Sequence, residues 1–163
     1  MKKYLVIGNP IDHSLSPKLH NYWFEKNNID AKYNRRKIDK SEIQEIISEI
    51  KDDKLDGINV TVPFKSDVIP FLDKLSEESR ITQSVNTIYK HDKKLIGHNT
   101  DIKGFELSLK ETQFNLKNKT IFLLGAGGVA PSIIYALEKS GVFKIIVSNR
   151  TKQKTENLKK YFS

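Results

Sequence analysis

The sequence contains no cysteine, and this absence excludes disulfide bonds, cysteine-ligated zinc and cysteine catalysis. Its apolar runs, such as residues 5–7 and 145–147, are short, so no segment is expected to span a bilayer. Residues 1–4, Met-Lys-Lys-Tyr, lead into a strand-like run and lack the apolar stretch of a secretory signal. We therefore expect a soluble cytoplasmic protein without membrane contact.

The net charge of +8 raises the question of a nucleic-acid partner, but its distribution argues against one. Residues 1–101 hold 17 Lys and Arg against 16 Asp and Glu, and residues 102–163 hold 11 against 4. The excess in the last third consists of scattered lysines and a single arginine, whereas sites that read or stack on bases favour arginine and exposed aromatics. The sequence predicts a solvated basic surface and no nucleic-acid function.

Apolar runs of strand length alternate with segments of helical period, a pattern typical of an α/β protein with a mostly parallel sheet. Ser16 and Pro17 predict a helix start with Ser16 as N-cap, and the stripe Leu19, Tyr22, Trp23 and Lys26 predicts its buried face. We expect strands at residues 3–8, 31–38, 57–62, 85–89, 94–98, 120–124 and 144–148. We expect helices from 16, from 41 with a face of Ile43, Ile46, Ile47 and Ile50, at 101–113, at 129–140 and at 152–161.

The polar segment 115–119 lacks helical periodicity and predicts a domain boundary. Residues 1–114 are expected to form one α/β domain, to which the family resemblance described below assigns substrate binding. Residues 115–163 supply little more than one βαβ unit, which predicts the start of a Rossmann cofactor domain.

A glycine turn lies between the strand at 120–124 and the following helix, with the pattern G-x-G-x-x-A at Gly125, Gly127 and Ala130. Gly125 permits the tight turn, Gly127 lets a pyrophosphate approach the backbone, and Ala130 keeps helix and strand close. The free N–H groups of the helix N-terminus favour an anion there. This setting favours a dinucleotide site over a turn that is merely tight.

The end of the next strand distinguishes between the nicotinamide cofactors. An NAD site usually has an acidic residue about 20 positions after the glycine turn, and residues 148–154 contain none. Arg150 and Lys154 could bind a 2′-phosphate, and Thr151 could donate a hydrogen bond to it. The sequence favours NADP over NAD.

Four polar clusters follow predicted strands in the first hundred residues, at positions 9–17, 59–65, 85–87 and 98–104. Ligands in open α/β sheets bind beyond the carboxyl ends of the strands, so these clusters are expected to converge. Taken singly, each has a structural explanation: Ser16 could only cap its helix, Thr61 could only favour a strand, and Lys65 could be one more solvated lysine.

These motifs together resemble the shikimate dehydrogenase family. The matching stretches are Gly8-Asn9-Pro10-Ile11, His13-Ser14-Leu15-Ser16-Pro17, Gly57-Ile58-Asn59-Val60-Thr61-Val62-Pro63-Phe64-Lys65, Ser84-Val85-Asn86-Thr87, Asn99-Thr100-Asp101-Ile102-Lys103-Gly104, Gly125-Ala126-Gly127-Gly128 and Asn149-Arg150-Thr151. The sequence departs from the family at Ser84, where alanine is usual.

The resemblance implies the roles of the site residues. Ser14 and Ser16 would bind the substrate carboxylate, and Thr61, Lys65, Asn86 and Asp101 the ring hydroxyls. Lys65 would be the catalytic acid and base, with Asp101 as its partner. The cofactor-binding residues would be Gly125, Ala126, Gly127, Gly128, Val129, Asn149, Arg150, Thr151, Lys154 and Glu77. No metal site is expected.

The activity implied is the reversible NADPH-dependent reduction of 3-dehydroshikimate to shikimate, in aromatic amino-acid biosynthesis. Two alternatives remain open: a quinate/shikimate dehydrogenase that uses NAD, and a non-catalytic module that binds shikimate or nucleotide. Family members continue with the rest of the cofactor domain, so we expect a truncated chain with an open sheet edge. Such an edge favours association, and a homodimer is the expected form.

Overall fold

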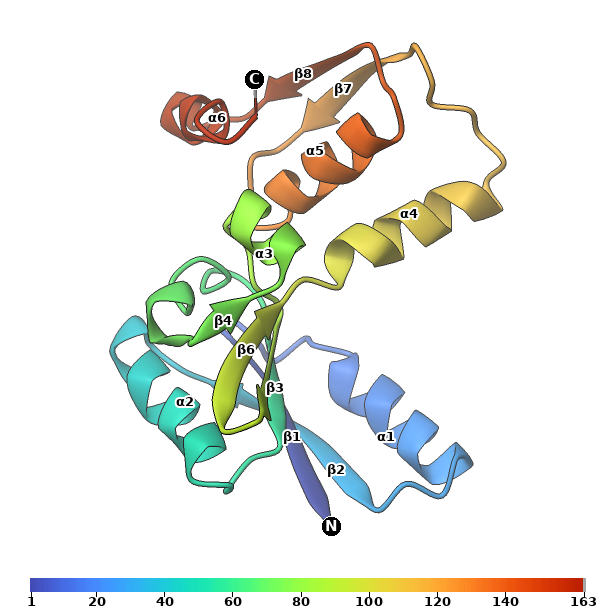
Figure 1. The fold of residues 1–163 in the computed structure, drawn as a ribbon. Helices are drawn as coiled ribbons and strands as arrows, with labels where there is room; N and C mark the ends of the chain where they lie inside the picture. Colours follow the sequence, from blue (N-terminus) through green and yellow to red (C-terminus); the bar gives the residue numbers. More distant parts are fainter. Residues whose placement is uncertain (163) are drawn as a thin grey trace.

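The computed structural model describes residues 1–162 and contains two separate sheets joined by helices (Figure 1). The strands are β1 (Lys2–Gly8), β2 (Ala31–Lys37), β3 (Gly57–Val60), β4 (Lys74–Leu75), β5 (Thr87–His91), β6 (Lys94–His98), β7 (Thr120–Leu124) and β8 (Lys144–Ser148). The helices are α1 (Ser16–Lys26), α2 (Ile43–Lys51), α3 (Glu77–Thr82), α4 (Asp101–Glu111), α5 (Ala130–Lys139) and α6 (Lys152–Leu158), with 3-10 turns η1 (Lys40–Glu42) and η2 (Ile69–Phe71).

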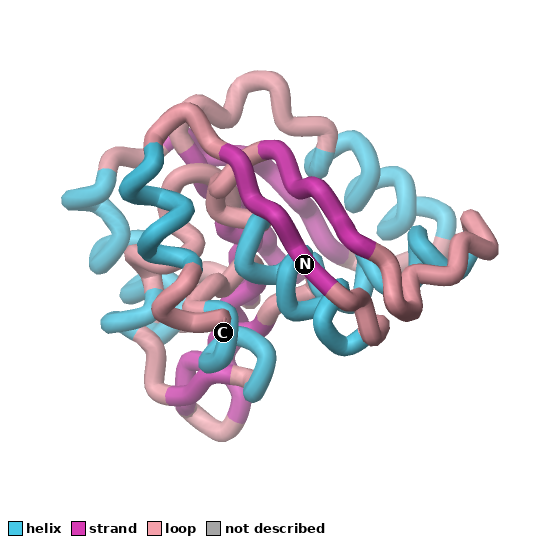
Figure 2. Tube along the Cα trace, turned by 90° about the horizontal axis from the view of Figure 1, so that it is seen from above, coloured by secondary structure: helices cyan, strands magenta, loops and turns pink. Residues whose placement is uncertain are grey.

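The larger sheet has the order β2-β1-β3-β5-β6-β4, and the smaller sheet pairs β7 with β8. Four pairs are parallel (β1–β2, β1–β3, β4–β6 and β7–β8), and β5 is antiparallel to both neighbours. The prediction of an α/β fold with a mostly parallel sheet is therefore confirmed. Helices lie on either side of the strands when the molecule is seen from above (Figure 2).

Most predicted elements are present, with changes at their ends. The strand expected at residues 57–62 ends at Val60, after which the chain turns at Thr61. The hairpin between β5 and β6 turns at Asp92 and Lys93. Their φ angles of 49° and 61° are both positive, as a two-residue type I′ turn requires. Sequence periodicity did not predict β4, α3 or η2, because each is too short to show a repeat.

Helix α2 covers one face of the larger sheet with the predicted isoleucine stripe. Ile43, Ile46, Ile47 and Ile50 are all buried. They form one apolar core with residues of the sheet, among them Ile7. This core is the largest cluster of apolar side chains in residues 1–162.

Helix α1 covers the opposite face, and here the prediction is wrong. The expected buried residues Leu19, Tyr22 and Trp23 are between 46% and 55% exposed, and no residue of α1 is fully buried. The helix instead faces the sheet with His20 and Phe24, which pack on aromatic rings of the strands. Both faces of α1 carry aromatic residues at helical spacing, so periodicity alone could not select the inner one.

The start of α1 also differs from its prediction. Pro17 lies in the first turn as expected, but Ser16 is already helical, and Leu15 occupies the N-cap position without a side-chain cap. The Ser16 N–H donates to the hydroxyl of Ser14 at 3.3 Å. Ser16 therefore does not cap the helix, because its own backbone has left the extended conformation that an N-cap needs.

The smaller sheet has its own core, formed by α5, α6 and the strands. Ala126, Ala130, Ile134 and Leu158 are buried in it. Helix α4 packs against α5 and connects this core with the end of β6 (Figure 1). Among residues 1–162 we find no helix with the length and hydropathy to cross a membrane, and no cluster of three His, Asp or Glu side chains that could hold a metal.

Candidate functional site

Polar segments gather at one end of the larger sheet, where its parallel strands have their carboxyl ends. This end of the sheet is called the edge below. Strands β1, β3 and β6 run in the same direction and end at this edge, and β5 begins there because it is antiparallel to β3. Backbone bonds join the segments: Thr61 N donates to Ile7 O at 3.0 Å, and Asn86 N donates to His98 O at 3.1 Å. The topology therefore brings together segments that lie up to about ninety residues apart.

Gly8, at the end of β1, allows the first of these close approaches. A Cβ at this position would lie 2.7 Å from Cγ2 of Thr61 and 3.0 Å from the carbonyl oxygen of Val62. Only a residue without a side chain fits here. The loop that carries Ser14 and leads to Ser16, the first residue of α1, starts from this point.

Lys65 and Asp101 form an ion pair at this edge. The Nζ atom of Lys65 lies 2.6 Å from Oδ2 of Asp101, and Lys65 is only 8% exposed. Its turn is anchored by two buried neighbours, Phe64 and Val68. An ammonium group taken from water requires such a partner, and the partner in turn fixes where the ammonium group points.

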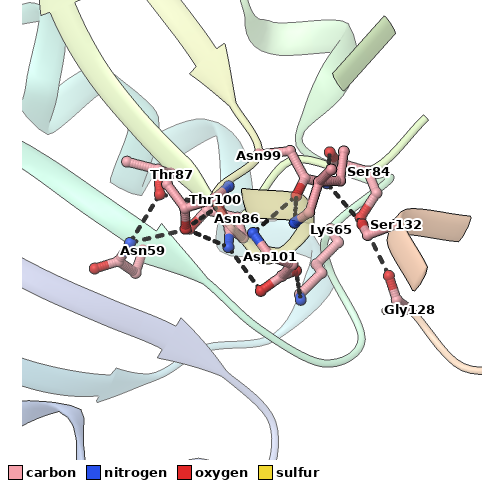
Figure 3. Close-up of polar contacts among 11 residues, drawn as sticks. Asn59, Lys65, Ser84, Asn86, Thr87, Asn99, Thr100, Asp101, Gly128 and Ser132 are labelled. Atoms are coloured by element: carbon pink, nitrogen blue, oxygen red, sulfur yellow. Dashed lines mark hydrogen bonds and ion pairs between the residues drawn. The ribbon is translucent and has the colours of Figure 1, made fainter. Parts of the chain in front are cut away.

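Asn86 ties this pair to the start of α4. Its Nδ2 atom donates to the other carboxylate oxygen of Asp101 and to the Thr100 hydroxyl, each at 2.9 Å. Its Oδ1 atom accepts the backbone N–H of Thr100 at 3.0 Å and the hydroxyl of Thr87 at 3.0 Å. Lys65 thus engages one oxygen of Asp101 and Asn86 the other, and the carboxylate is held in one orientation (Figure 3).

The row of polar groups continues away from Lys65 through Asn59. The amide of Asn59 donates to Asn86 O at 3.1 Å and to the Thr87 hydroxyl at 3.0 Å. The hydroxyl of Tyr33 donates to Asn59 Oδ1 at 2.6 Å, and burial raises the pKa of Tyr33. Tyr33 therefore stays protonated and acts as a donor in this row.

The remaining predicted substrate residues lie in the loops and at the helix start at this edge. Ser14 and Ser16 are half-buried at the start of α1, and Thr61 is half-buried just beyond β3. Among the hydrogen bonds of residues 1–162, none joins the side chains of these three residues to the pair of Lys65 and Asp101. They leave polar groups available to a ligand that would lie across this edge.

The glycine turn follows β7 and lies next to Lys65. Gly125 has φ of +108°, and a Cβ added at Gly127 would meet no atom within 4 Å. A Cβ added at Gly128 would lie 3.7 Å from Cδ of Lys65. In the hydrogen bonds of residues 1–162 the N–H groups of Gly127, Gly128 and Val129 have no acceptor. The turn thus offers open space and free donors, which suits a phosphate group.

The residues predicted to bind the adenosine side surround this turn unevenly. Asn149 accepts the N–H of Ala126 at 3.1 Å and donates to Thr151 O at 2.9 Å, so it links β8 to the turn. Arg150, Thr151 and Lys154 are exposed at the start of α6. Glu77 is at the first position of α3, a helix that packs against α5.

The polar residues of this region that were not predicted as site residues include Asn59, Asn99 and Ser132. Asn99 lies two residues before Asp101, the first residue of α4, and accepts the N–H of Asp101 at 3.0 Å, so the preference of asparagine for helix starts could have found it. Ser132 lies inside α5 and gives no such signal in the sequence.

Residues 6–88 match the family described as the shikimate dehydrogenase substrate binding domain, which is more than half of the chain. The chain belongs to the shikimate dehydrogenase family. Residues 106–163 match a second family, described as shikimate / quinate 5-dehydrogenase.

Relatives with this name resemble the chain along nearly all of its length. It is 60% identical over 161 residues to a shikimate dehydrogenase (NADP(+)) of Pelagibacter ubique, an alignment that covers 99% of the chain and 61% of the relative. A shikimate dehydrogenase (NADP(+)) of Caldicellulosiruptor saccharolyticus is 42% identical, with 99% and 59% covered.

Solved structures of shikimate dehydrogenases share the fold. The protein from Aquifex aeolicus gives a TM-score of 0.92 at 40% identity, with 99% of this chain and 60% of that chain covered. The protein from Thermus thermophilus, solved in complex with shikimate, gives 0.90 at 31% identity, with 99% and 61% covered. The chain therefore spans about 60% of the length of the shikimate dehydrogenases it matches.

Proposed function

We propose that this chain serves the reversible NADPH-dependent reduction of 3-dehydroshikimate to shikimate. The observation that carries the proposal is the buried ion pair of Lys65 and Asp101, 2.6 Å apart, directly beside the glycine turn. A proton donor and a phosphate-binding turn thereby lie within one small region. The names of the relatives support the same activity.

The polar groups at the sheet edge suit a small hydroxylated acid. In the proposal, Ser14 and Ser16 bind its carboxylate at the start of α1, where the helix N-terminus favours a negative charge. Thr61 and Asn86 bind ring hydroxyls, and Asp101 accepts a hydrogen bond from one of them. The structure solved with shikimate belongs to a relative with the same fold and supports this substrate.

Lys65 is proposed as the acid and base. When bound, the nicotinamide cofactor supplies or accepts the hydride. In the direction of reduction, the Nζ atom of Lys65 gives a proton to the carbonyl oxygen as negative charge develops there. In the direction of oxidation the same nitrogen takes the proton from the hydroxyl. Asn86 holds one carboxylate oxygen of Asp101, and the other oxygen fixes the position of the Lys65 nitrogen.

The cofactor is proposed to bind with its pyrophosphate at residues 125–129. Three free N–H groups and the open space at Gly127 support this placement. Asn149, Arg150, Thr151 and Lys154 would hold the adenosine phosphate, and the absence of an acidic residue in 148–154 favours NADP over NAD. Glu77 is proposed only as a further cofactor contact.

Substituting Arg150 and Lys154 tests the choice of cofactor. Arg150→Ala combined with Lys154→Ala should weaken NADP⁺ binding about tenfold or more and leave NAD⁺ binding within about twofold, because only NADP⁺ carries the 2′-phosphate. Titration calorimetry measures both affinities. Equal losses for the two cofactors, or faster turnover with NADH than with NADPH, would favour the NAD-dependent alternative.

Substituting Lys65 tests the proposed chemistry. Lys65→Ala should lower shikimate-dependent NADP⁺ reduction by about 10²–10⁴-fold and change the shikimate affinity by less than about threefold. Lys74→Ala, which removes an exposed lysine on β4, is the matched control. Near-normal turnover in Lys65→Ala would rule out the role of Lys65. Tight binding of shikimate without turnover in the unsubstituted chain would favour the non-catalytic binding module.

Three further expectations stay predictions. The boundary between a substrate domain at 1–114 and a cofactor domain at 115–163 falls between the two sheets, which supports it. The homodimer is checked by sedimentation equilibrium. The cytoplasmic location is checked by fractionation of cells that express the chain.

A further inference from the structure

A short chain of hydrogen bonds from three buried side chains reaches the exposed Gly128 and connects the larger sheet with the glycine turn. The hydroxyl of Ser84 donates to Gly128 O at 3.1 Å. The Nδ2 atom of Asn99 donates to Ser84 O and to the Ser132 hydroxyl, each at 2.8 Å. Ser84 and Asn99 belong to the edge of the larger sheet, whereas Gly128 and Ser132 belong to the turn and to α5 (Figure 3).

These side chains are shielded from water. Ser84 and Asn99 are each 2% exposed and Ser132 is fully buried. Within residues 1–162 no buried side-chain oxygen or nitrogen is left without a hydrogen-bond partner. A buried polar network favours one arrangement of its members, because a shift can leave a buried polar group unpaired.

Asn99 serves both sides of the contact. Its Oδ1 atom accepts the N–H of Asp101 at 3.0 Å and that of Ile102 at 3.4 Å, so it caps the start of α4. Its Nδ2 atom points the other way, to Ser132 in the first turn of α5. The residue that positions the backbone of Asp101 therefore also contacts the helix that follows the glycine turn.

Ser84 links the same turn to Lys65. Its hydroxyl holds the carbonyl of Gly128, and the next residue, Val85, donates its N–H to Lys65 O at 2.8 Å. Gly128 lies beside the side chain of Lys65, as the 3.7 Å approach of an added Cβ indicates. Both members of the ion pair are thus connected to the turn through a few hydrogen bonds.

The second polar tie between the helices of the two sheets is much weaker. Glu106 on α4 lies 3.3 Å from Nζ of Lys139 on α5, and the Lys139 side chain is half exposed. Exposed ion pairs contribute little and are screened by salt. The buried cluster is closer to the site than this ion pair, and together with the packing of α4 against α5 it can set the geometry between the turn and the pair of Lys65 and Asp101.

We propose that Ser84, Asn99 and Ser132 form a polar latch that holds the glycine turn in register with Lys65 and Asp101. The proposal rests on the function proposed above only in its second part: binding of a dinucleotide at the turn tightens the binding of shikimate at the ion pair through the latch. All three are positioning residues, since they act through Gly128, Lys65 and Asp101.

The first experiment measures the latch without any ligand. Because the chain has no cysteine, Gln44→Cys on α2 and Gln153→Cys on α6 place two nitroxide labels on exposed positions, one near each sheet. Double electron–electron resonance should give a narrow distribution of the distance between the two labels in the parent chain. Ser84→Ala combined with Ser132→Ala should broaden it about twofold or more, because the hydroxyl contacts are lost without a large change in volume.

Ser79→Ala is the matched control. Ser79 is fully buried, and its hydroxyl accepts a hydrogen bond from Ser76 within the same helix start, so it has no part in the latch. The control should leave the distance distribution unchanged. A distribution that stays equally narrow in the double variant, or that broadens equally in Ser79→Ala, would overturn the latch.

The second experiment measures the linkage between ligands, which a merely structural contact would not carry. In the parent chain, saturating NADP⁺ should tighten shikimate binding about fivefold or more, and in the double variant by less than about twofold. Calorimetry with each ligand alone and together gives both values. An unchanged linkage in the double variant would overturn the coupling role. A parent chain that binds neither ligand would refute the proposed function and the coupling that rests on it, while the distance distributions would still judge the latch itself.

Discussion

At the scale of residues, the site depends on which lysine is buried. The chain has 24 lysines, and Lys65 differs from most of them because its side chain is held between a packed turn and the carboxylate of Asp101. A lysine in such a place is a positioned proton donor, whereas an exposed lysine samples many rotamers. Burial alone would be costly, and the contacts of Asp101 with Lys65 and Asn86 offset that cost.

Asp101→Asn tests this arrangement. The substitution keeps the shape and one hydrogen bond but removes the charge that holds the Lys65 ammonium, so turnover of shikimate with NADP⁺ should fall about 10–100-fold. Asp67→Asn breaks a different ion pair, with the exposed Lys40, and should leave turnover within about twofold. Equal rates for the two variants would contradict the positioning role of Asp101.

At the scale of elements, α1 and α2 cover opposite faces of the larger sheet with very different contacts. Helix α2 buries four isoleucines, and α1 buries no residue completely. The outer stripe of α1, which consists of Leu19, Tyr22 and Trp23, is exposed. The ammonium group of Lys26 lies 5.1 Å from the centre of the Trp23 ring. The stability of the larger sheet therefore depends on α2 far more than on α1.

Two alanine substitutions measure this difference. Ile46→Ala in α2 should lower the free energy of unfolding by about 2–5 kcal/mol, because it opens a cavity in the main core. Leu19→Ala in α1 should change it by no more than about 0.5 kcal/mol. Urea unfolding followed by circular dichroism gives both values. A comparable loss of unfolding free energy at the two positions would show that α1 packs on the sheet through its outer stripe.

The inner face of α1 predicts a dependence on pH. His20 stacks on Tyr33 with ring centres 4.2 Å apart, and burial lowers the pKa of His20. The unfolded chain therefore takes up the proton first as the pH falls, so stability is full above about pH 6.5 and decreases below it toward the lower pKa of the folded state.

The measurement for this prediction is urea unfolding at several pH values. His20→Phe should reduce the loss of unfolding free energy between neutral and mildly acid pH, since it keeps an aromatic ring and removes the titrating group. His91→Gln, at the exposed β5–β6 hairpin, serves as control and should leave the loss unchanged. An identical pH dependence in His20→Phe and the unsubstituted chain would show that His20 is protonated equally in both states.

The sequence predicts elements better than contacts, for physical reasons that particular residues illustrate. The strands at 94–98, 120–124 and 144–148 agree with their predictions to the residue, because apolar runs with polar ends specify them locally. The inner face of α1 did not follow, since two aromatic stripes compete for it. Asn99 and Ser132 could not be paired from sequence either, because their contact depends on how α4 and α5 pack.

At the scale of the whole molecule, charge and architecture separate in the same way. Residues 1–101, which form the larger sheet, are nearly neutral, and the excess of positive charge belongs to residues 102–163 with the glycine turn. A positive field around a phosphate-binding turn attracts a polyanionic cofactor over distances of about a Debye length, roughly 10 Å at 0.1 M salt. The charge asymmetry thus favours the side of the molecule proposed for NADP.

Salt titration tests this asymmetry. Raising the KCl concentration from about 0.05 M to about 0.5 M should weaken NADP⁺ binding several-fold more than shikimate binding, because NADP⁺ carries more negative charge and meets the more positive region. Calorimetry at each salt concentration gives both affinities. Parallel losses for the two ligands would mean that the charge of residues 102–163 is only a solvated surface.

The most direct measurement is the formation of NADPH by the unsubstituted chain when shikimate and NADP⁺ are both present. We predict NADPH formation that requires shikimate and is lost in Lys65→Ala, and slower formation of NADH when NAD⁺ replaces NADP⁺. NADPH formation that persists at the same rate in Lys65→Ala, or none at all from a chain that binds both ligands, would contradict the assignment of Lys65 and Asp101 as the centre of this reaction.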